Sequence, residues 1–287
     1  MSFPLGVLFG LIAMFGWGLA DFFAKKTVEK IGDFRTLFWT QIVGFIILTS
    51  AYFVFAPQFN YTIGDIIIFA LIGLLGSSAY LLFYRALKKG QVSILSPIQA
   101  SWVVITVILS VIFLNEVLGN FQAITIAITI LGIILVSFKY KDLKRLKLKN
   151  LLPGVPEDLI SMSLWGINFV IIGFLVSKFN WFIPIFFLRL FMIFFLLCFS
   201  SIKREKITFN ERKVIPWLIL IGVCDVSAFL GFGLGVSSGY VSIVSPVAAS
   251  FPLITIILAR IFLKERLGIN QKIGIVGIII GLILLSI

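Results

Sequence analysis

Three ionisable side chains stand within long apolar stretches of the 287-residue sequence: Asp21, Arg189 and Asp225. Placing such a group in an apolar environment is costly, so we expect each to have a partner or a function. A guanidinium there can bind a carboxylate or a phosphate, and a carboxylate can bind an organic cation or carry a proton. The sequence has no histidine and only two cysteines. We therefore expect no metal site and no cofactor.

The composition predicts the elements that position these residues. Hydrophobic residues make up 60% of the chain and charged residues 13%, against about 45–50% and about 25% in soluble domains. A helix needs about 20 mainly apolar residues to cross a bilayer. We expect an all-α integral membrane protein with ten transmembrane helices, over residues 4–24, 34–55, 65–86, 91–114, 119–138, 157–177, 181–202, 214–236, 240–263 and 268–287.

Basic residues alternate between the loops. The connections after the odd-numbered helices hold 20 of the 24 lysine and arginine residues, whereas those after the even-numbered helices hold only Lys178. Basic loops face the cytoplasm, so the pattern predicts a multi-pass protein of the cell membrane with both termini outside. The net charge of +12 therefore reports orientation in the lipid bilayer, and we expect no nucleic-acid partner.

The two halves of the sequence are related by an internal repeat. Residues 86–137 align with residues 235–286 without a gap, and 26 of the 52 positions are identical. The best-matched part reads GQVSILSPIQAS at 90–101 and GYVSIVSPVAAS at 239–250. We therefore divide the chain into a first five-helix repeat (1–138), a basic central loop (139–154) and a second five-helix repeat (155–287).

Each repeat has an odd number of helices, so the two repeats must insert into the membrane in opposite orientations. Inverted repeats are typical of secondary transporters, which bind substrate near the middle of the membrane between the repeats. The sequence has no GxxxxGK[ST] loop for ATP and no HExxH or GxSxG motif for catalysis. It therefore favours a transporter that does not use ATP over an enzyme, and no residue is predicted to be catalytic.

Several short motifs occur once in each repeat: Trp17-Gly18 and Trp165-Gly166 in the first helix, Ser96-Pro97 and Ser245-Pro246 in the fourth, Glu116 and Glu265 after the fourth, and Gly132 and Gly281 in the fifth. In this order they resemble the EamA-type ten-helix transporters of the drug/metabolite transporter superfamily, over essentially the whole chain. The resemblance implies a carrier of metabolites, amino acids, sugars or drugs, with a central cavity walled mainly by the first four helices of each repeat. It also implies cytoplasmic termini for many members, whereas the loop charges here predict external ones.

The repeat provides a control for the charged residues of the second half. Arg189 aligns with Gln41 and Asp225 aligns with Gly76, so the second repeat has both charges and the first has neither. This predicts an ion pair between Arg189 and Asp225. The pair could be a structural bridge between the seventh and eighth helices, or Arg189 could receive a substrate carboxylate or phosphate while Asp225 modulates it.

The other carboxylates each allow more than one interpretation. Asp21 could pair with Lys25 at i,i+4, or it could face the cavity and contact a cationic substrate or carry a coupling proton. Glu116 and Glu265 follow the fourth helix of each repeat. We expect them to cap the fifth helix or to pair with nearby cations.

Prolines and glycines give two further predictions. Pro97, Pro246 and Pro252 should kink the fourth and ninth helices, either for packing or as bending points between two transport states. Glycines recur on one face of the tenth helix, which we expect to pack closely on the fifth helix, with a dimer interface as the alternative. The protein could thus be a monomer or a homodimer.

The cavity candidates are charged, aromatic and amide side chains on the helices expected to form its walls. Aromatic rings offer apolar bodies and faces for cations, and buried amides need partners. The predicted set is Trp17, Asp21, Trp39, Gln41, Tyr80, Tyr84, Gln99, Trp102, Trp165, Asn168, Arg189, Asp225 and Phe229.

Taken together, the residues favour a secondary transporter that moves a small organic metabolite, such as an amino acid, by alternating access. Transport of this metabolite could be coupled to the movement of protons. A passive channel, or an integral membrane enzyme or scaffold, is the alternative.

Overall fold

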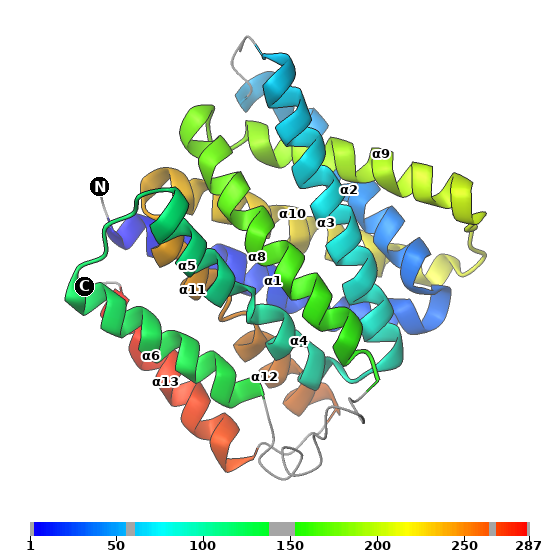
Figure 1. The fold of residues 1–287 in the computed structure, drawn as a ribbon. Helices are drawn as coiled ribbons and strands as arrows, with labels where there is room; N and C mark the ends of the chain where they lie inside the picture. The colour runs from blue at the N-terminus through cyan, green and yellow to red at the C-terminus, as the bar shows by residue number, and fades with distance from the viewer. Residues whose placement is uncertain (1–2, 56–60, 138–152, 264–267, 286–287) are drawn as a thin grey trace.

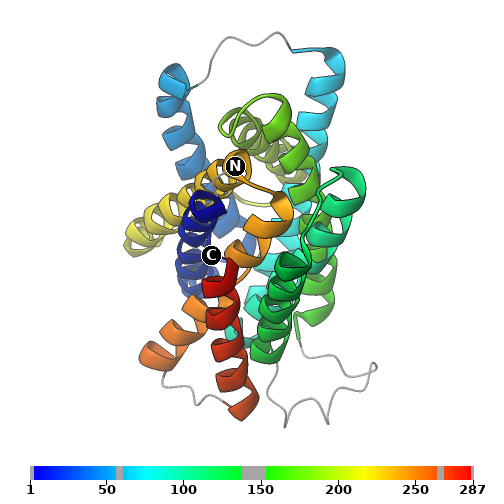
Figure 2. The same ribbon diagram turned by 90° about the vertical axis from the view of Figure 1, so that its left-hand side faces the viewer.

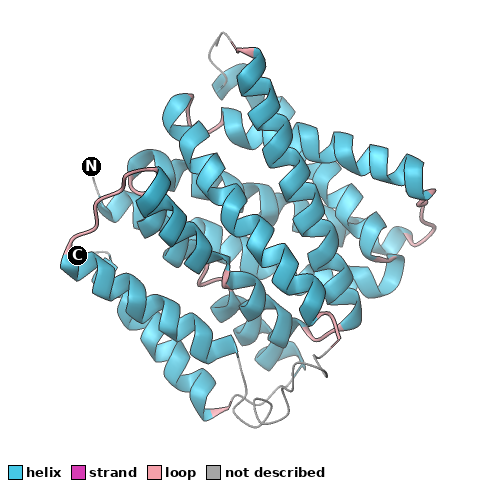
Figure 3. Cartoon of the chain, viewed as in Figure 1, coloured by secondary structure: helices cyan, strands magenta, loops and turns pink. Residues whose placement is uncertain are grey.

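The computed structural model describes residues 3–55, 61–137, 153–263 and 268–285. Every regular element within these ranges is helical, as Figure 3 shows. Eight helices are long and apolar enough to cross a membrane, and two shorter apolar helices cover Asn120–Leu135 and Lys272–Gly281. The predicted ten-helix membrane fold is confirmed.

The helices follow the two repeats in order. The first repeat contains α1 (Phe3–Ile31), α2 (Asp33–Phe55), α3 (Ile63–Lys89), the pair α4 (Val92–Ala100) and α5 (Trp102–Phe113), and α6 (Asn120–Ser137). The second contains α8 (Val155–Lys178), α9 (Ile183–Lys203), α10 (Ile215–Ser238), the pair α11 (Val241–Ala248) and α12 (Pro252–Leu263), and α13 (Ile269–Leu285), with a short turn η2 (Arg212–Val214) before α10. The first helix ends seven residues beyond its predicted end, because its last polar turns continue past the apolar stretch.

The fourth helix of each repeat is interrupted at the same place. Pro97 lies inside α4, and Pro246 lies inside α11. Proline cannot donate a backbone hydrogen bond, and in both repeats the helix turns tightly four residues later. There the Ser101 hydroxyl donates to the Pro97 carbonyl at 3.3 Å, and the Ser250 hydroxyl donates to the Pro246 carbonyl at 2.8 Å. The carbonyl freed at each break thus recovers a donor. In the second repeat, α12 starts shortly after the break, at Pro252.

Matching helix pairs interlock the two repeats. α1 packs along α10, and its counterpart α8 packs along α3, while α2 packs on α9 and α6 packs on α13. Figures 1 and 2 show α6 and α13 side by side at one edge of the bundle, and the beginning of α1 on the same side as the end of α13. Each of these contacts joins one repeat to the other, as two inverted repeats require.

The Trp-Gly motifs mark where the first helix of one repeat meets the interrupted helix of the other. The Thr255 hydroxyl donates to the Gly18 carbonyl at 3.2 Å, and the Thr106 hydroxyl donates to the Gly166 carbonyl at 3.0 Å. A Cβ at Gly18 would lie 2.6 Å from the Ile254 side chain, so only glycine permits this approach. The motif thereby brings the adjacent tryptophan close to the middle of the bundle.

The α6–α13 contact gives a prediction about stability. A Cβ added at Gly132 would lie 2.7 Å from the backbone nitrogen of Ile278, whereas one at Gly277 would have its nearest neighbour at 3.4 Å. We expect Gly132→Ala to lower the free energy of unfolding by about 1–3 kcal/mol, because backbone atoms must move apart. Gly277→Ala is the matched control and should be tolerated. Thermal unfolding of the purified variants tests this, and equal losses at both positions would contradict the predicted difference.

Candidate functional site

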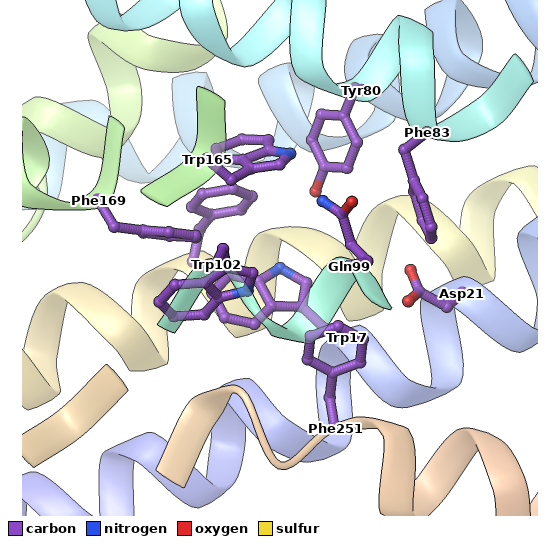
Figure 4. Close-up of a pocket in the computed structure, with 10 residues that line it drawn as sticks. Trp17, Asp21, Tyr80, Phe83, Gln99, Trp102, Trp165, Phe169 and Phe251 are labelled. Carbon is purple, nitrogen blue, oxygen red and sulfur yellow. The ribbon is translucent and has the colours of Figure 1, made fainter. Parts of the chain in front are cut away.

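A small cavity lined by buried side chains lies at the centre of the bundle, between the two repeats. Its volume is about 30 Å³, which is roughly the space of one water molecule. An organic molecule can therefore enter only after the surrounding helices move apart. Its walls, shown in Figure 4, are formed by Trp17, Asp21, Tyr80, Phe83, Gln99, Trp102, Trp165, Phe169, Phe229 and Phe251.

Aromatic rings form most of this wall. The ring centroids of Trp17 and Phe229 are 5.2 Å apart in an edge-to-face contact, and those of Trp102 and Phe169 are 4.2 Å apart. Such contacts are favourable beyond the apolar area that they bury, so the rings hold each other in place. Their faces can receive an apolar group or an organic cation.

The cavity has a polar end and an aromatic end. Figure 4 shows Asp21 and Gln99 toward one end, and Trp102 and Trp165 toward the other. Asp21 is buried, with 8% of its surface exposed. The arrangement can therefore receive a molecule with a cationic or hydrogen-bonding group on one side and an apolar group on the other.

Asp21 is free for this role because it does not form the local ion pair with Lys25. The Lys25 Nζ instead donates to the carbonyls of Leu87 and Gly90, at 2.7 and 2.9 Å, and pairs with Glu29 at 3.0 Å. Carbonyls at a helix end lack intrahelical partners, and a lysine satisfies them well. The interpretation of Asp21 as half of an i,i+4 pair with Lys25 is therefore wrong.

The ion pair predicted between Arg189 and Asp225 is present. The Nη2 atom of Arg189 lies 2.8 Å from Oδ2 of Asp225, and the Arg189 side chain is fully buried. Gln41 accepts a hydrogen bond from Arg189, and Tyr80 donates one to Asp225. The guanidinium also lies over the Phe229 ring, 5.3 Å from its centroid. These contacts connect α2, α3, α9 and α10.

This polar network lies directly behind the cavity wall. Tyr80 and Phe229 belong to both the wall and the network, whereas Arg189 and Asp225 do not line the cavity. Gly44 leaves room for the guanidinium, because a Cβ there would lie 3.3 Å from Cζ of Arg189. The network therefore orients the Tyr80 hydroxyl and holds four helices together. A direct contact between Arg189 and a substrate stays a prediction.

Four other predicted cavity residues lie elsewhere. Gln41 is engaged by Arg189, and Tyr84 packs edge-on against Tyr80 with centroids 5.9 Å apart. The Trp39 indole donates to the Ile207 carbonyl at 3.0 Å, and the Asn168 amide donates to the Ile72 carbonyl at 3.2 Å. Buried polar side chains need a partner, and each of these four residues has its own contact without lining the cavity.

Three wall residues that the sequence analysis missed could have been found from the repeat. Phe169 aligns with Asp21, Phe251 aligns with Trp102, and Tyr80 aligns with Phe229, so both repeats contribute equivalent positions to one cavity. Phe83 is the third missed residue. Its counterpart in the second repeat, Phe232, packs against the Trp17 ring of the cavity wall. Where the first repeat has the polar residues Asp21 and Tyr80, the second repeat has phenylalanines at the equivalent positions. The first repeat thus contributes the polar end of the cavity.

Glu116 caps a helix, but not the one predicted. Its carboxylate accepts hydrogen bonds from the backbone N–H groups of Val241 and Ser242, at 2.7 and 2.9 Å. These residues begin α11 of the other repeat, whereas the start of α6 is served by Gln122, whose side chain accepts from the Gly119 N–H at 2.9 Å. Glu265 lies outside the described residues.

The Glu116 cap gives a second prediction about stability. Replacing Glu116 by alanine leaves two buried N–H groups at the start of α11 without an acceptor, which should cost about 1–2 kcal/mol. Glu211→Ala, at an exposed position, is the control. Thermal unfolding of both variants measures the difference, and the cap contributes nothing if they unfold at the same temperature.

A ten-helix bundle built from two inverted repeats around a central cavity has the architecture of a membrane transporter. The EamA-like transporter family matches residues 4–138 and residues 158–287, so the chain belongs to that family and is a multi-pass membrane transporter. An uncharacterized transporter of Archaeoglobus fulgidus is 26% identical over 303 aligned positions, which cover 98% of each chain.

Two further similarities agree with this assignment. An uncharacterized protein of Methanocaldococcus jannaschii is 41% identical over 86 residues, and this match spans 30% of the present chain and 63% of that relative. A solved crystal structure superposes with a TM-score of 0.75 over 97% of the present chain and 95% of its own, at 14% sequence identity. At that identity the superposition supports the fold alone.

Proposed function

We propose that this protein is a secondary carrier of small organic metabolites, amino acids foremost, and that it works by alternating access across the cell membrane. The observation that carries this proposal is the central cavity between the repeats, with Asp21 at one end and tryptophans at the other. An amino acid brings an ammonium group for the carboxylate and a side chain for the rings.

The small size of the cavity and the burial of its lining side chains favour a carrier over a passive channel. A channel needs a continuous path, whereas a carrier passes through a state in which its site is sealed on both sides. The interrupted helices α4–α5 and α11–α12 are suited to act as bending points, because each carries a proline and a break four residues later. We propose an orientation with the ends that carry Lys25 and Lys89 in the cytoplasm and both termini outside, which the basic loops support.

A ligand screen followed by uptake tests this function. Purified protein is screened by thermal shift against amino acids and related metabolites, because a true ligand stabilises more as its concentration rises. The stabilising compound is then offered to vesicles that contain the protein. We expect saturable uptake, and flux that stays linear with concentration would indicate a channel instead.

Two tryptophan variants make the test specific to the cavity. We expect Trp17→Ala to reduce uptake at least about tenfold, because it removes a ring from the wall and about 1.4 kcal/mol of contact already corresponds to that factor. Trp39→Ala is the matched control, since Trp39 lies against Ile207 and away from the cavity. Equal losses in the two variants would argue against the cavity as the binding site.

A further inference from the structure

Asp158 is a fully buried carboxyl group that the site described above does not use. It lies in the first turn of α8, and its side chain is 0% exposed. Neither of its carboxyl oxygens has a hydrogen-bond partner, and the ion pairs found among the described residues do not include it. Its neighbour Glu157 is different, because Glu157 points outward and pairs with Lys89.

The face of α8 that carries Asp158 leads to the central cavity. Residues three and seven positions further along a helix lie on the same face, which places Ser161 and Trp165 in line with Asp158. The Ser161 hydroxyl donates to the Ala79 carbonyl of α3 at 2.8 Å. Trp165 lines the cavity. Asp158 therefore lies between the cavity and the end of the bundle where α3 ends in Lys88 and Lys89.

Asp21 of α1, the carboxylate in the cavity wall, carries the same charge as an ionised Asp158 and cannot neutralise it. The described residues of α4 and α5, which also pack on α8, include no ionisable side chain. The basic groups at the end of α3 are engaged elsewhere, Arg85 and Lys88 by Asp33 and Lys89 by Glu157.

The remaining ionisable groups near α8 are also engaged with one another. Arg189 of α9 pairs with Asp225 of α10, and Tyr80 of α3 donates to Asp225. Tyr84 of α3 packs against Tyr80. No cation among the described groups therefore neutralises Asp158.

These surroundings suit a proton rather than a metal ion. An ionised carboxylate without a partner in this position would cost several kcal/mol, so the neutral acid is the form that fits. A bound alkali or alkaline-earth cation needs about six oxygen ligands, and both Asp158 oxygens lack partners. Within the described part of the chain no group of three carboxylate or sulfur side chains could hold a metal.

We propose that Asp158 is a proton-binding site between the cytoplasmic end of the bundle and the cavity. The proposal rests on the carrier function and on the orientation proposed above. When this proton is released, the O–H bond of Asp158 breaks while an O–H bond forms on a water molecule that has entered the opened site. Asp158 is left ionised and takes its next proton from the cytoplasmic solution when this end of the bundle opens.

Infrared spectroscopy of the purified protein in lipid vesicles tests the proposal, with the proton itself as the ligand. A protonated carboxyl has a C=O stretch separate from that of a carboxylate, and exchange into heavy water shifts it. We expect such a band in the wild type and in Glu157→Gln, and its loss in Asp158→Asn, which preserves the size of the side chain. Isotopically labelled aspartate in the wild type identifies the band as an aspartate even if Asp158→Asn does not fold. A wild-type protein without an exchangeable aspartic acid band, or a band that survives in folded Asp158→Asn, would overturn the proposal.

A transport readout separates this inference from the proposed function. We expect a pH gradient to change uptake by wild-type vesicles and to have no effect in Asp158→Asn, while Glu157→Gln keeps the wild-type response. Absence of uptake in all three proteins, with the infrared band present, would remove the carrier function and leave the proton site. Uptake in Asp158→Asn that still responds to the gradient would overturn the role of Asp158 in proton transfer.

Discussion

Replacing Arg189 by glutamine while Asp225 remains should destabilise the folded protein by about 3–5 kcal/mol, the usual cost of leaving one member of a buried ion pair without its partner. Asp225 is 4% exposed. After the substitution it would retain the hydrogen bond from Tyr80 but would have no positive charge beside it. Thermal unfolding of the purified variant measures this loss.

The double substitution Arg189→Gln with Asp225→Asn should recover most of that stability. The first repeat already has an uncharged version of the same positions, with Gln41 and Gly76. A double-mutant cycle with both single variants therefore gives the coupling between the two charges. Losses that simply add would show that the two charges do not stabilise each other.

An exposed ion pair provides the comparison for this cycle. Lys88 pairs with Asp33 at 3.1 Å, and the Lys88 side chain is 57% exposed. Exposed pairs contribute about 0–1 kcal/mol, so Lys88→Gln should have a far smaller effect than Arg189→Gln.

Asp21→Asn should have the largest effect on transport. Removing one partner of a buried charge contact costs about 2–5 kcal/mol, and each 1.4 kcal/mol corresponds to a factor of about ten in affinity. We expect the apparent affinity for a substrate with an ammonium group to fall at least tenfold, as measured by the concentration dependence of uptake. The amide preserves the shape of the side chain, so the change reports the lost negative charge.

Two controls distinguish a substrate contact from a general defect. Asp33→Asn removes a carboxylate at the end of the bundle and should leave the affinity unchanged. A substrate analogue without the ammonium group should bind wild-type protein and Asp21→Asn equally well. Equal weakening for both compounds in Asp21→Asn would exclude a direct contact between Asp21 and the ammonium group.

The membrane fold could be predicted from the sequence because its signals are long and repeated. Apolar stretches of about 20 residues identify the spans, and the aligned motifs at 90–101 and 239–250 identify the repeat. The Arg189–Asp225 pair was also predictable, because the first repeat has uncharged residues, Gln41 and Gly76, at both of the aligned positions. Helix ends were less predictable, since a helix such as α1 continues beyond its apolar stretch.

The cavity wall was only partly predictable because composition does not say which face a side chain occupies. Asn168 has an amide side chain and Trp39 an indole, as wall residues do. The side-chain N–H of each nevertheless donates to a backbone carbonyl outside the wall. The helix that Glu116 caps was predicted wrongly, because the N–H groups that donate to its carboxylate belong to the other repeat and local spacing cannot reveal them. Asp158 was missed because a carboxylate in the first turn of a helix is usually a favourable and exposed feature.

Counterflow tests the central claim, alternating access through the cavity between the repeats, most directly. Vesicles that contain the protein are loaded with a high concentration of the stabilising compound and then given a trace of the same compound in labelled form outside. A carrier exchanges one for the other, so the label should accumulate transiently above its outside concentration, and Trp17→Ala should abolish this while Trp39→Ala retains it. Label that only equilibrates across the membrane would contradict alternating access.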